Sequence, residues 1–173
     1  MSVSEVAKLS ADEAEQHLGG LTDVLLDCVA GGASVSFMAD LTRAEAEDFW
    51  RATIADMKTG VQHLFAAFNG KRLTGTVLLQ PCWKPNQPHR ADVAKLLVHR
   101  AARRGGTASR LMDALEERAR ALGFTLLTLD TETGSAAEPF YARRGYVRVG
   151  DIPGYALSPD GRLCGTTFYY KRL

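Results

Sequence analysis

A basic turn rich in glycine is the segment of this sequence best suited to holding a phosphate. The residues Arg103-Arg104-Gly105-Gly106-Thr107-Ala108 fit the pattern Arg/Gln-x-x-Gly-x-Gly/Ala, after an apolar run and ahead of a helical pattern. Backbone N–H groups in the first turn of a helix have no intrahelical acceptor, and the helix dipole makes that end positive. Glycines let a pyrophosphate approach this backbone, and the two arginines add charge-assisted hydrogen bonds. The turn therefore predicts a pyrophosphate site; the alternative is an ordinary basic turn between a strand and a helix.

Two aspartates flank the helix that this turn opens. Asp92 stands at the start of the apolar run before the turn, and Asp130 directly follows the apolar run after the helix. If these runs form adjoining strands, both carboxylates could face one cleft at the sheet edge where ligands of α/β proteins bind. Each has a structural alternative. Asp92 could be a solvated carboxylate beside Arg90 and Lys95, and Asp130 could bond the backbone of the loop after it.

A phenol and a hydroxyl occur on a short predicted helix further along the chain. Tyr141 can donate a proton, although without other information it is as readily a half-buried aromatic packed beside Phe140. Ser135 begins the segment Ser-Ala-Ala-Glu, which has capping-box spacing. No metal site is expected, because the histidines lack ligand spacing and the cysteines lie far apart: His17, His63, His89, His99, Cys28, Cys82 and Cys164.

The remaining pattern predicts the elements that position these residues. Capping boxes and helical spacing indicate helices that span 11–29, 43–58, 107–122 and 136–144. Asn69-Gly70 is typical of a hairpin turn between two strands. The expected strands are 61–68, 72–80, 91–98, 124–129, 146–149 and 167–171, with a proline-rich loop at 81–89 and a turn-rich loop before the last strand. The order predicts an α/β sandwich with a mixed sheet, in which residues 91–129 form a right-handed parallel crossover.

Composition and charge restrict the class of protein. The chain has 173 residues, of which 46% are hydrophobic and 24% charged, which indicates one soluble globular domain over residues 1–173. A net charge of +1 argues against a nucleic-acid partner. No apolar run approaches the roughly 18–20 residues that span a bilayer, so no membrane partner is expected. Residues 1–14 lack the apolar core of a signal peptide, and this and the dispersed cysteines predict a cytoplasmic protein.

The features described so far combine into a resemblance to a known family. The strand Asp92–Val98, then Arg103-x-x-Gly106-x-Ala108, a strand ending at Asp130, and Phe140-Tyr141-x-x-x-Gly145-Tyr146 resemble the GNAT family of acetyl-CoA-dependent N-acetyltransferases. Longer segments similar to one family member extend the likeness over nearly the whole chain: 31–41, 130–135, 153–155 and 158–163. The resemblance implies a mixed, mostly antiparallel sheet with a central parallel β-α-β crossover and helices on both faces. It also implies transfer of an acetyl group from acetyl-CoA to the amino group of a small molecule, amino-acid-like or a β-lactam toxin.

The resemblance implies roles for individual residues as well. Acetyl-CoA, as cosubstrate and without a metal, is expected to contact Leu96, Leu97, Val98, Arg103, Arg104, Gly105, Gly106, Thr107, Ala108, Ser109 and Ser135. In this family the strand segment 96–98 splays from its neighbour and supplies N–H donors to the thioester oxygen. Tyr141 would protonate the departing CoA thiolate. The acceptor amine, with an ordinary pKa of about 8–10, must be neutral to attack, so Asp92 or Asp130 would take its proton.

The turn departs from the commoner family pattern in two places. Arg104 and Gly105 stand in reverse order relative to Arg-Gly-x-Gly, and Ala108 occupies a position where many members have glycine. The alternative to an enzyme is a non-catalytic acyl-CoA-binding sensor that uses the same turn. The presence of both aspartates and the tyrosine favours the enzyme. The identity of the amine and the oligomeric state are left open.

Overall fold

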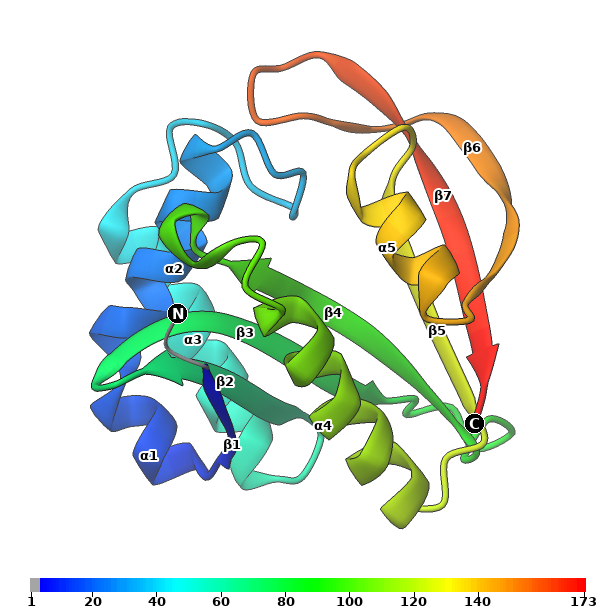
Figure 1. The fold of residues 1–173 in the computed structure, drawn as a ribbon, viewed down its shortest axis with the longest axis horizontal. Helices are drawn as coiled ribbons and strands as arrows, with labels where there is room; N and C mark the ends of the chain where they lie inside the picture. Colours follow the sequence, from blue (N-terminus) through cyan, green and yellow to red (C-terminus); the bar gives the residue numbers. More distant parts are fainter. Residues whose placement is uncertain (1–3) are drawn as a thin grey trace.

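The computed structural model describes residues 4–173, which form one seven-stranded sheet with helices packed on both of its faces (Figure 1). The elements follow in the order β1 (Glu5–Leu9), α1 (Ala11–Gln16), α2 (Leu18–Ala30), α3 (Arg43–Lys58), β2 (His63–Asn69), β3 (Arg72–Pro81), β4 (Arg90–Val98), the 3₁₀ turn η1 (Arg100–Ala102), α4 (Thr107–Ala121), β5 (Leu126–Glu132), α5 (Ala137–Arg143), β6 (Val147–Leu157) and β7 (Leu163–Arg172).

The sheet is mixed, with strand order β1-β2-β3-β4-β5-β7-β6. The pair β4–β5 is parallel and the other five pairs are antiparallel. Helix α4 makes the connection between the two parallel strands, as Figure 1 shows in green. These observations confirm the predicted fold class, including the central β-α-β crossover and helices on both faces.

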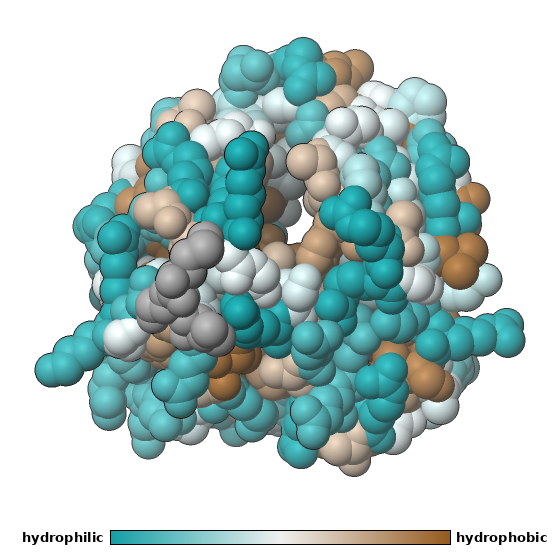
Figure 2. Space-filling view, viewed as in Figure 1, coloured by the Kyte–Doolittle hydropathy of each residue, from teal (hydrophilic) through white to brown (hydrophobic). Residues whose placement is uncertain are grey.

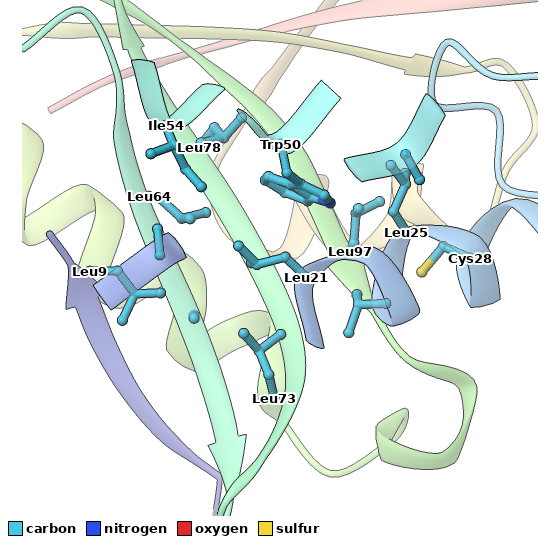
Figure 3. Packing of buried hydrophobic residues seen from close by; sticks show 14 of the residues in the cluster. Leu9, Leu21, Leu25, Cys28, Trp50, Ile54, Leu64, Leu73, Leu78 and Leu97 are labelled. Carbon is cyan, nitrogen blue, oxygen red and sulfur yellow. The ribbon is translucent and has the colours of Figure 1, made fainter. Parts of the chain in front are cut away.

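The sheet separates two hydrophobic cores. Strand β2 shows how: Leu64 and Ala66 face one core, and the intervening Phe65 and Ala67 face the other, as the two-residue period of a strand requires. Figure 3 shows the first core, which α2 and α3 cover; its labelled members include Leu21, Leu25, Trp50, Ile54, Leu78 and Leu97. Helices α4 and α5 cover the second core, with Leu111, Met112, Leu115, Ala119 and Tyr141.

The N-terminal part differs from the sequence prediction. The single helix expected over 11–29 is wrong: α1 ends at Gln16, and α2 begins at Leu18 after His17. Gly20 in α2 is required by the close packing of this helix on β3, because a β carbon there would lie 3.0 Å from the Leu73 side chain. Strand β1 has no counterpart in the prediction; it pairs with β2 over five residues.

The C-terminal part also differs from the prediction. β6 continues to Leu157 through the segment expected to be a loop, and the shift in its register between Ile152 and Ala156 accommodates Pro153-Gly154. β6 is the outermost strand, where a proline removes no hydrogen bond from a second neighbour. The capping box expected at Ser135 is not formed. The residue before α5 is Ala136, and the Glu138 carboxylate accepts instead from the Gly134 N–H and the Tyr169 hydroxyl.

Candidate active site

The two parallel strands separate after a short stretch of pairing. The β4–β5 register extends from Arg90↔Leu126 to Asp92↔Thr128 and no further. β4 nevertheless stays paired with β3 up to Val98, and β5 stays paired with β7 up to Glu132. The central strands therefore diverge while each remains held from its outer side, and this opens the middle of the sheet. The divergence agrees with the splay that the family resemblance implies.

A cavity of about 290 Å³ lies at this divergence. The residues that line it come from the segment after α2, from β4, from the end of β5 and from α5: Gly32, Ala33, Ser34, Val35, Ser36, Val93, Ala94, Lys95, Leu96, Asp130, Thr131, Glu132, Ser135, Ala137 and Tyr141. Figure 2 shows a hollow near the middle of the face seen in Figure 1. The volume suits a small molecule or one end of a larger one.

Asp130 brings a carboxylate to the cavity wall. It lies opposite Phe168 of β7, and β5 continues past it to Glu132 instead of ending at Asp130 as the sequence suggested. Desolvation by the surrounding walls raises its pKa above the ordinary value; the positive charge of Lys95 opposes this rise and the negative charge of Asp92 adds to it. A carboxylate with a raised pKa is a better base than a solvated one, and Asp130 is open to the cavity.

Tyr141 faces the same cavity from α5. The residue is 7% exposed, and its ring packs against Tyr146 and Tyr169 in the second core. Within residues 4–173 no group hydrogen-bonds its hydroxyl. Burial, with a smaller contribution from Asp130, raises the pKa of this phenol far above its usual range. Tyr141 is therefore protonated at any physiological pH and has a proton to donate. Both its catalytic and its packing interpretation fit this position.

Asp92 has a different environment. Its carboxylate is hydrogen-bonded by the Arg90 guanidinium and the Thr128 hydroxyl, near the start of β4 where β4 and β5 are still paired. It is not part of the cavity wall, although its charge is felt at Asp130. Of the two aspartates, Asp130 lines this cavity and Asp92 does not, so a role for Asp92 as base stays a prediction. This side chain ties β4 to β5 just before they separate.

The basic turn has the backbone conformation of an anion site. Gly106 caps α4 with a φ of +78°, so the N–H groups of the first turn, at Thr107, Ala108 and Ser109, have no acceptor within the helix. Arg104 has a φ of +63°, in the region that glycine adopts freely. In the commoner order Arg-Gly-x-Gly a glycine would stand at this position, and here the reversed order places an arginine there. The Gly105 carbonyl accepts from Arg110, a basic residue beside the turn that the pattern did not include.

Other expected cofactor contacts divide between the cavity and the core. Leu96 lines the cavity, whereas the side chain of Leu97 lies in the first core and could contribute only backbone groups. The Val98 carbonyl accepts from the Nε of Arg103 at 3.0 Å, which holds that guanidinium against the end of β4. Ser135 lines the cavity, and its hydroxyl lies 3.3 Å from that of Thr131.

Lys95, Glu132 and the segment 32–34 are cavity residues that the sequence patterns did not identify as part of the site, whereas Val35 and Ser36 belong to a loop, 35–41, in which acceptor specificity was expected to lie. Lys95 carried a usable signal, because a charged residue in a strand otherwise rich in apolar residues needs a partner. The Glu132 carboxylate forms an ion pair with Arg162, in the turn between β6 and β7, with Oε1 2.9 Å from the guanidinium nitrogen Nη2. No local pattern predicts that residues 32–34 line the cavity, because their position depends on how α2 packs on the sheet.

Comparison with known proteins decides the family. The model of the Acetyltransferase (GNAT) family matches residues 33–146, which include the basic turn, Tyr141 and all of the cavity lining except Gly32. The chain belongs to this family. Its fold is also similar to that of solved structures with low sequence identity.

Three such structures illustrate the similarity. An N-acetyltransferase from Staphylococcus aureus Mu50 has a TM-score of 0.80 at 15% identity, with 98% of each chain covered. A ribosomal-protein-alanine N-acetyltransferase from Brucella melitensis has a TM-score of 0.79 at 20% identity, covering 98% of this chain and 99% of that one. The protein yncA from Salmonella typhimurium, solved with its cofactor acetyl-CoA, has a TM-score of 0.79 at 15% identity, with 99% and 94% covered.

Two kinds of feature are absent from residues 4–173. No group of three or more histidine, cysteine, aspartate or glutamate side chains within that range is arranged to hold a metal ion. No helix in the same range is long and apolar enough to cross a bilayer.

Proposed function

We propose that this GNAT protein is an N-acetyltransferase that moves an acetyl group from acetyl-CoA to the amino group of a small molecule. The observation that carries the proposal is the cavity between the diverging strands, where Asp130 and Tyr141 face the same space from β5 and α5. A base and an acid beside one cavity are what acyl transfer to an amine requires.

The turn at Arg103–Ser109 is the proposed phosphate site. Gly106 leaves the backbone uncovered at the N-terminus of α4, and Arg104 is exposed beside it. Acetyl-CoA bound here would supply the activated acetyl group as a thioester. The chain from Val98 to Leu96 leads from this turn back to the cavity, so the pantetheine arm would follow β4 and end near Tyr141. Ser135 is proposed as a further contact of that arm.

The proposed chemistry assigns one proton to each side chain. Asp130, directly or through a water, takes the proton of the acceptor ammonium, which frees the nitrogen lone pair. The nitrogen attacks the acetyl carbonyl carbon; a C–N bond forms and the C–S bond breaks. Backbone N–H groups of the segment 96–98 are the proposed donors to the carbonyl oxygen. Tyr141 gives its proton to the departing sulfur, so CoA leaves as the free thiol. The acylated nitrogen then loses its second proton, which restores the Tyr141 phenol directly or through solvent. Asp92, which the sequence made an equal candidate, is proposed to act indirectly, through its charge and its ties to Arg90 and Thr128.

A small, amino-acid-like amine is the proposed acceptor class. The cavity volume of about 290 Å³ is at the small end of the range for ligand sites. The segments 31–41, 130–135, 153–155 and 158–163 resemble those of the tabtoxin resistance protein, which extends the proposal to a β-lactam toxin as acceptor. The first and second of these segments contribute cavity residues.

The test is release of CoA thiol from acetyl-CoA in the presence of a panel of amines. The panel contains free amino acids, short polyamines, a β-lactam amino acid and a peptide with N-terminal alanine. The proposal expects thiol release that saturates with one small amine and exceeds the hydrolysis seen without amine. An acyl-CoA sensor would instead bind acetyl-CoA, detected as a raised melting temperature, and release no thiol with any amine. That result would refute the enzyme and leave the sensor.

A further inference from the structure

Lys95 is the most unusual side chain in the cavity. It has a φ of +50° inside β4, a conformation that a residue with a β carbon seldom adopts in a strand. Its ammonium nitrogen lies 3.0 Å from the Val35 carbonyl oxygen and 3.4 Å from the Ser36 hydroxyl. The same nitrogen lies 5.7 Å from the ring centre of Phe37 and 5.5 Å from that of Phe49. One cation therefore contacts both the segment after α2 and the face of α3.

This arrangement carries an energetic cost that packing alone does not explain. Burial partly desolvates the charged ammonium of Lys95, and this lowers its pKa below the ordinary value. Among residues 4–173 the ammonium has no carboxylate at salt-bridge distance; Asp130 is the negative charge that acts on it. An aliphatic side chain would fill the same space without the desolvation cost. The contacts thus point to a use for the charge itself.

The first use is to fix the cavity wall. Ser36 has a φ of +76° and is exposed, so the segment 33–37 lacks the regular hydrogen bonding of a strand or helix. Lys95 donates to two consecutive residues of this segment, and its stem reaches them from β4 across the cavity edge. Ala33, Val35 and Phe37 also pack against the first core, so loss of these donors would loosen the wall at its cavity side while leaving the sheet paired.

The second use is electrostatic. Asp130 faces Asp92 and Lys95 from β4, Tyr141 from α5, and Glu132 from its own strand, where Glu132 is paired with Arg162. Lys95 is the cation in this set that is not already paired with a carboxylate. A positive charge near a carboxylate favours its ionised form, which is the form that accepts a proton.

We propose that Lys95 is a positioning residue whose ammonium fastens the wall at 33–37 and keeps Asp130 in its carboxylate form. The inference rests on the proposed function for its consequence in turnover, but both of its parts are properties of the protein without substrate. An uncharged residue that still donates a hydrogen bond should therefore preserve the wall and lose the electrostatic effect.

The experiment compares Lys95→Met, Lys95→Gln and Lys95→Arg, with Lys71→Met on the exposed β2–β3 turn as a matched control. Each replacement at position 95 keeps a β carbon, so the backbone cost at φ +50° is the same in all three. The first readout is the ¹³C titration of the Asp130 carboxyl, assigned with Asp130→Asn. We expect its midpoint to rise by about one pH unit in the Met and Gln variants and to stay unchanged in the Arg and control variants.

The second readout is hydrogen exchange of the backbone in 33–37. Exchange should become about tenfold faster in Lys95→Met and much less so in Lys95→Gln or Lys95→Arg. In turnover, the acid limb of kcat/KM should move to higher pH in the Met and Gln variants by the same amount as the carboxyl midpoint. An unchanged Asp130 midpoint together with unchanged exchange in these variants would overturn the proposal.

The two proposals fail in distinguishable ways. If the wild-type protein acetylates no amine, the proposed function fails, and the titration and exchange of the substrate-free protein still decide the role of Lys95. If turnover is present but Lys95→Gln has the parent's acid limb and the parent's carboxyl midpoint, the proposed function stands and the electrostatic part of the Lys95 proposal is refuted. Unchanged exchange of 33–37 in Lys95→Met would refute the other part. Should the Met variant not fold, the Gln and Arg variants carry the same comparison.

Discussion

Replacement of Asp130 by asparagine should separate chemistry from structure at the candidate site. Asparagine keeps the size of the side chain and some hydrogen bonding but cannot take a proton. Asp130 lines the cavity and is open to it, so the change should leave both cores and the basic turn intact. We expect kcat/KM at pH 7 to fall by about 10²-fold or more, the range for a general base.

The pH dependence gives the size of the expected recovery. An amine with a pKa of about 9 is about 1% neutral at pH 7 and half neutral at pH 9, so the free-base fraction rises about 50-fold. The Asp130→Asn variant depends on that fraction and should recover about 50-fold between these pH values. The wild-type protein should gain much less, because its base removes the proton at pH 7. Since the pKa of Asp130 is raised, the wild-type acid limb should lie above the ordinary aspartate value of 3.8.

Asp92→Asn is the matched comparison on the neighbouring strand. Asp92 is bound by Arg90 and Thr128 outside the cavity wall, so its loss should lower the melting temperature and reduce kcat/KM by less than about tenfold. The assay is thiol release from acetyl-CoA between pH 6 and 10, with melting temperatures measured in parallel. A loss at Asp130 that is below twofold, or that does not recover with pH, would refute its role as base. A pH-rescued loss at Asp92 alone would transfer that role to Asp92.

Three further outcomes follow from the structure. Acetyl-CoA at a hundredfold excess over Kd should stabilise the protein by about 2.7 kcal/mol and so raise its melting temperature. Gly106→Val should abolish this rise, whereas Gly123→Val, with similar φ at the other end of α4, should keep it. Equal shifts in both variants would show that the turn is not the phosphate site. Tyr141→Phe removes only the hydroxyl, so acetyl-CoA should bind as before while kcat falls by about 10²-fold, and activity within twofold of the parent would leave the tyrosine a packing role. Burial raises the pKa of Asp27, but its hydrogen bonds with the Arg100 backbone and side chain outweigh this and hold the pKa below the ordinary value. The stabilising effect of the Asp27 carboxylate is therefore present above pH 3.8 and lost as pH falls through the folded pKa. Asp27→Asn should lower the unfolding free energy, measured with urea, by about 1–3 kcal/mol at pH 7 and by little near pH 3. A loss that does not depend on pH would contradict this.

Local signals predicted the elements whose causes are local. The capping boxes that begin at Ser10 and Thr42 form as expected, because each serine or threonine and the glutamate three residues later satisfy each other's backbone groups. The hairpin at Asn69-Gly70 forms because Gly70 supplies a positive φ. Similar spacing at Ser135 did not produce a cap, because Tyr169 on β7 competes for the Glu138 carboxylate. That competitor is 31 residues away, and no local pattern contains it.

The same distinction applies to the candidate site. The basic turn could be placed from the sequence, since a strand followed by glycines and a helix defines its geometry locally. Asp130 could be proposed from its position at the end of an apolar run. The separate fate of Asp92 could not, because it depends on how far β4 and β5 remain paired before they diverge. Lys95 was missed for a related reason: its partners Val35 and Ser36 lie about 60 positions earlier in the chain and meet it only through the packing of α2.

The most direct test of the account is to follow the acetyl group itself. The protein is incubated at pH 8 with acetyl-CoA carrying ¹³C in the acetyl carbonyl and with the amine panel, and the ¹³C spectrum is recorded over time. The account predicts that the thioester signal declines while an amide signal of equal intensity grows on one small amine, with free CoA thiol in the same amount. The Asp130→Asn variant should show the same conversion about 10²-fold more slowly at pH 7. A thioester signal that shifts on binding to the protein but persists with every amine would contradict the account.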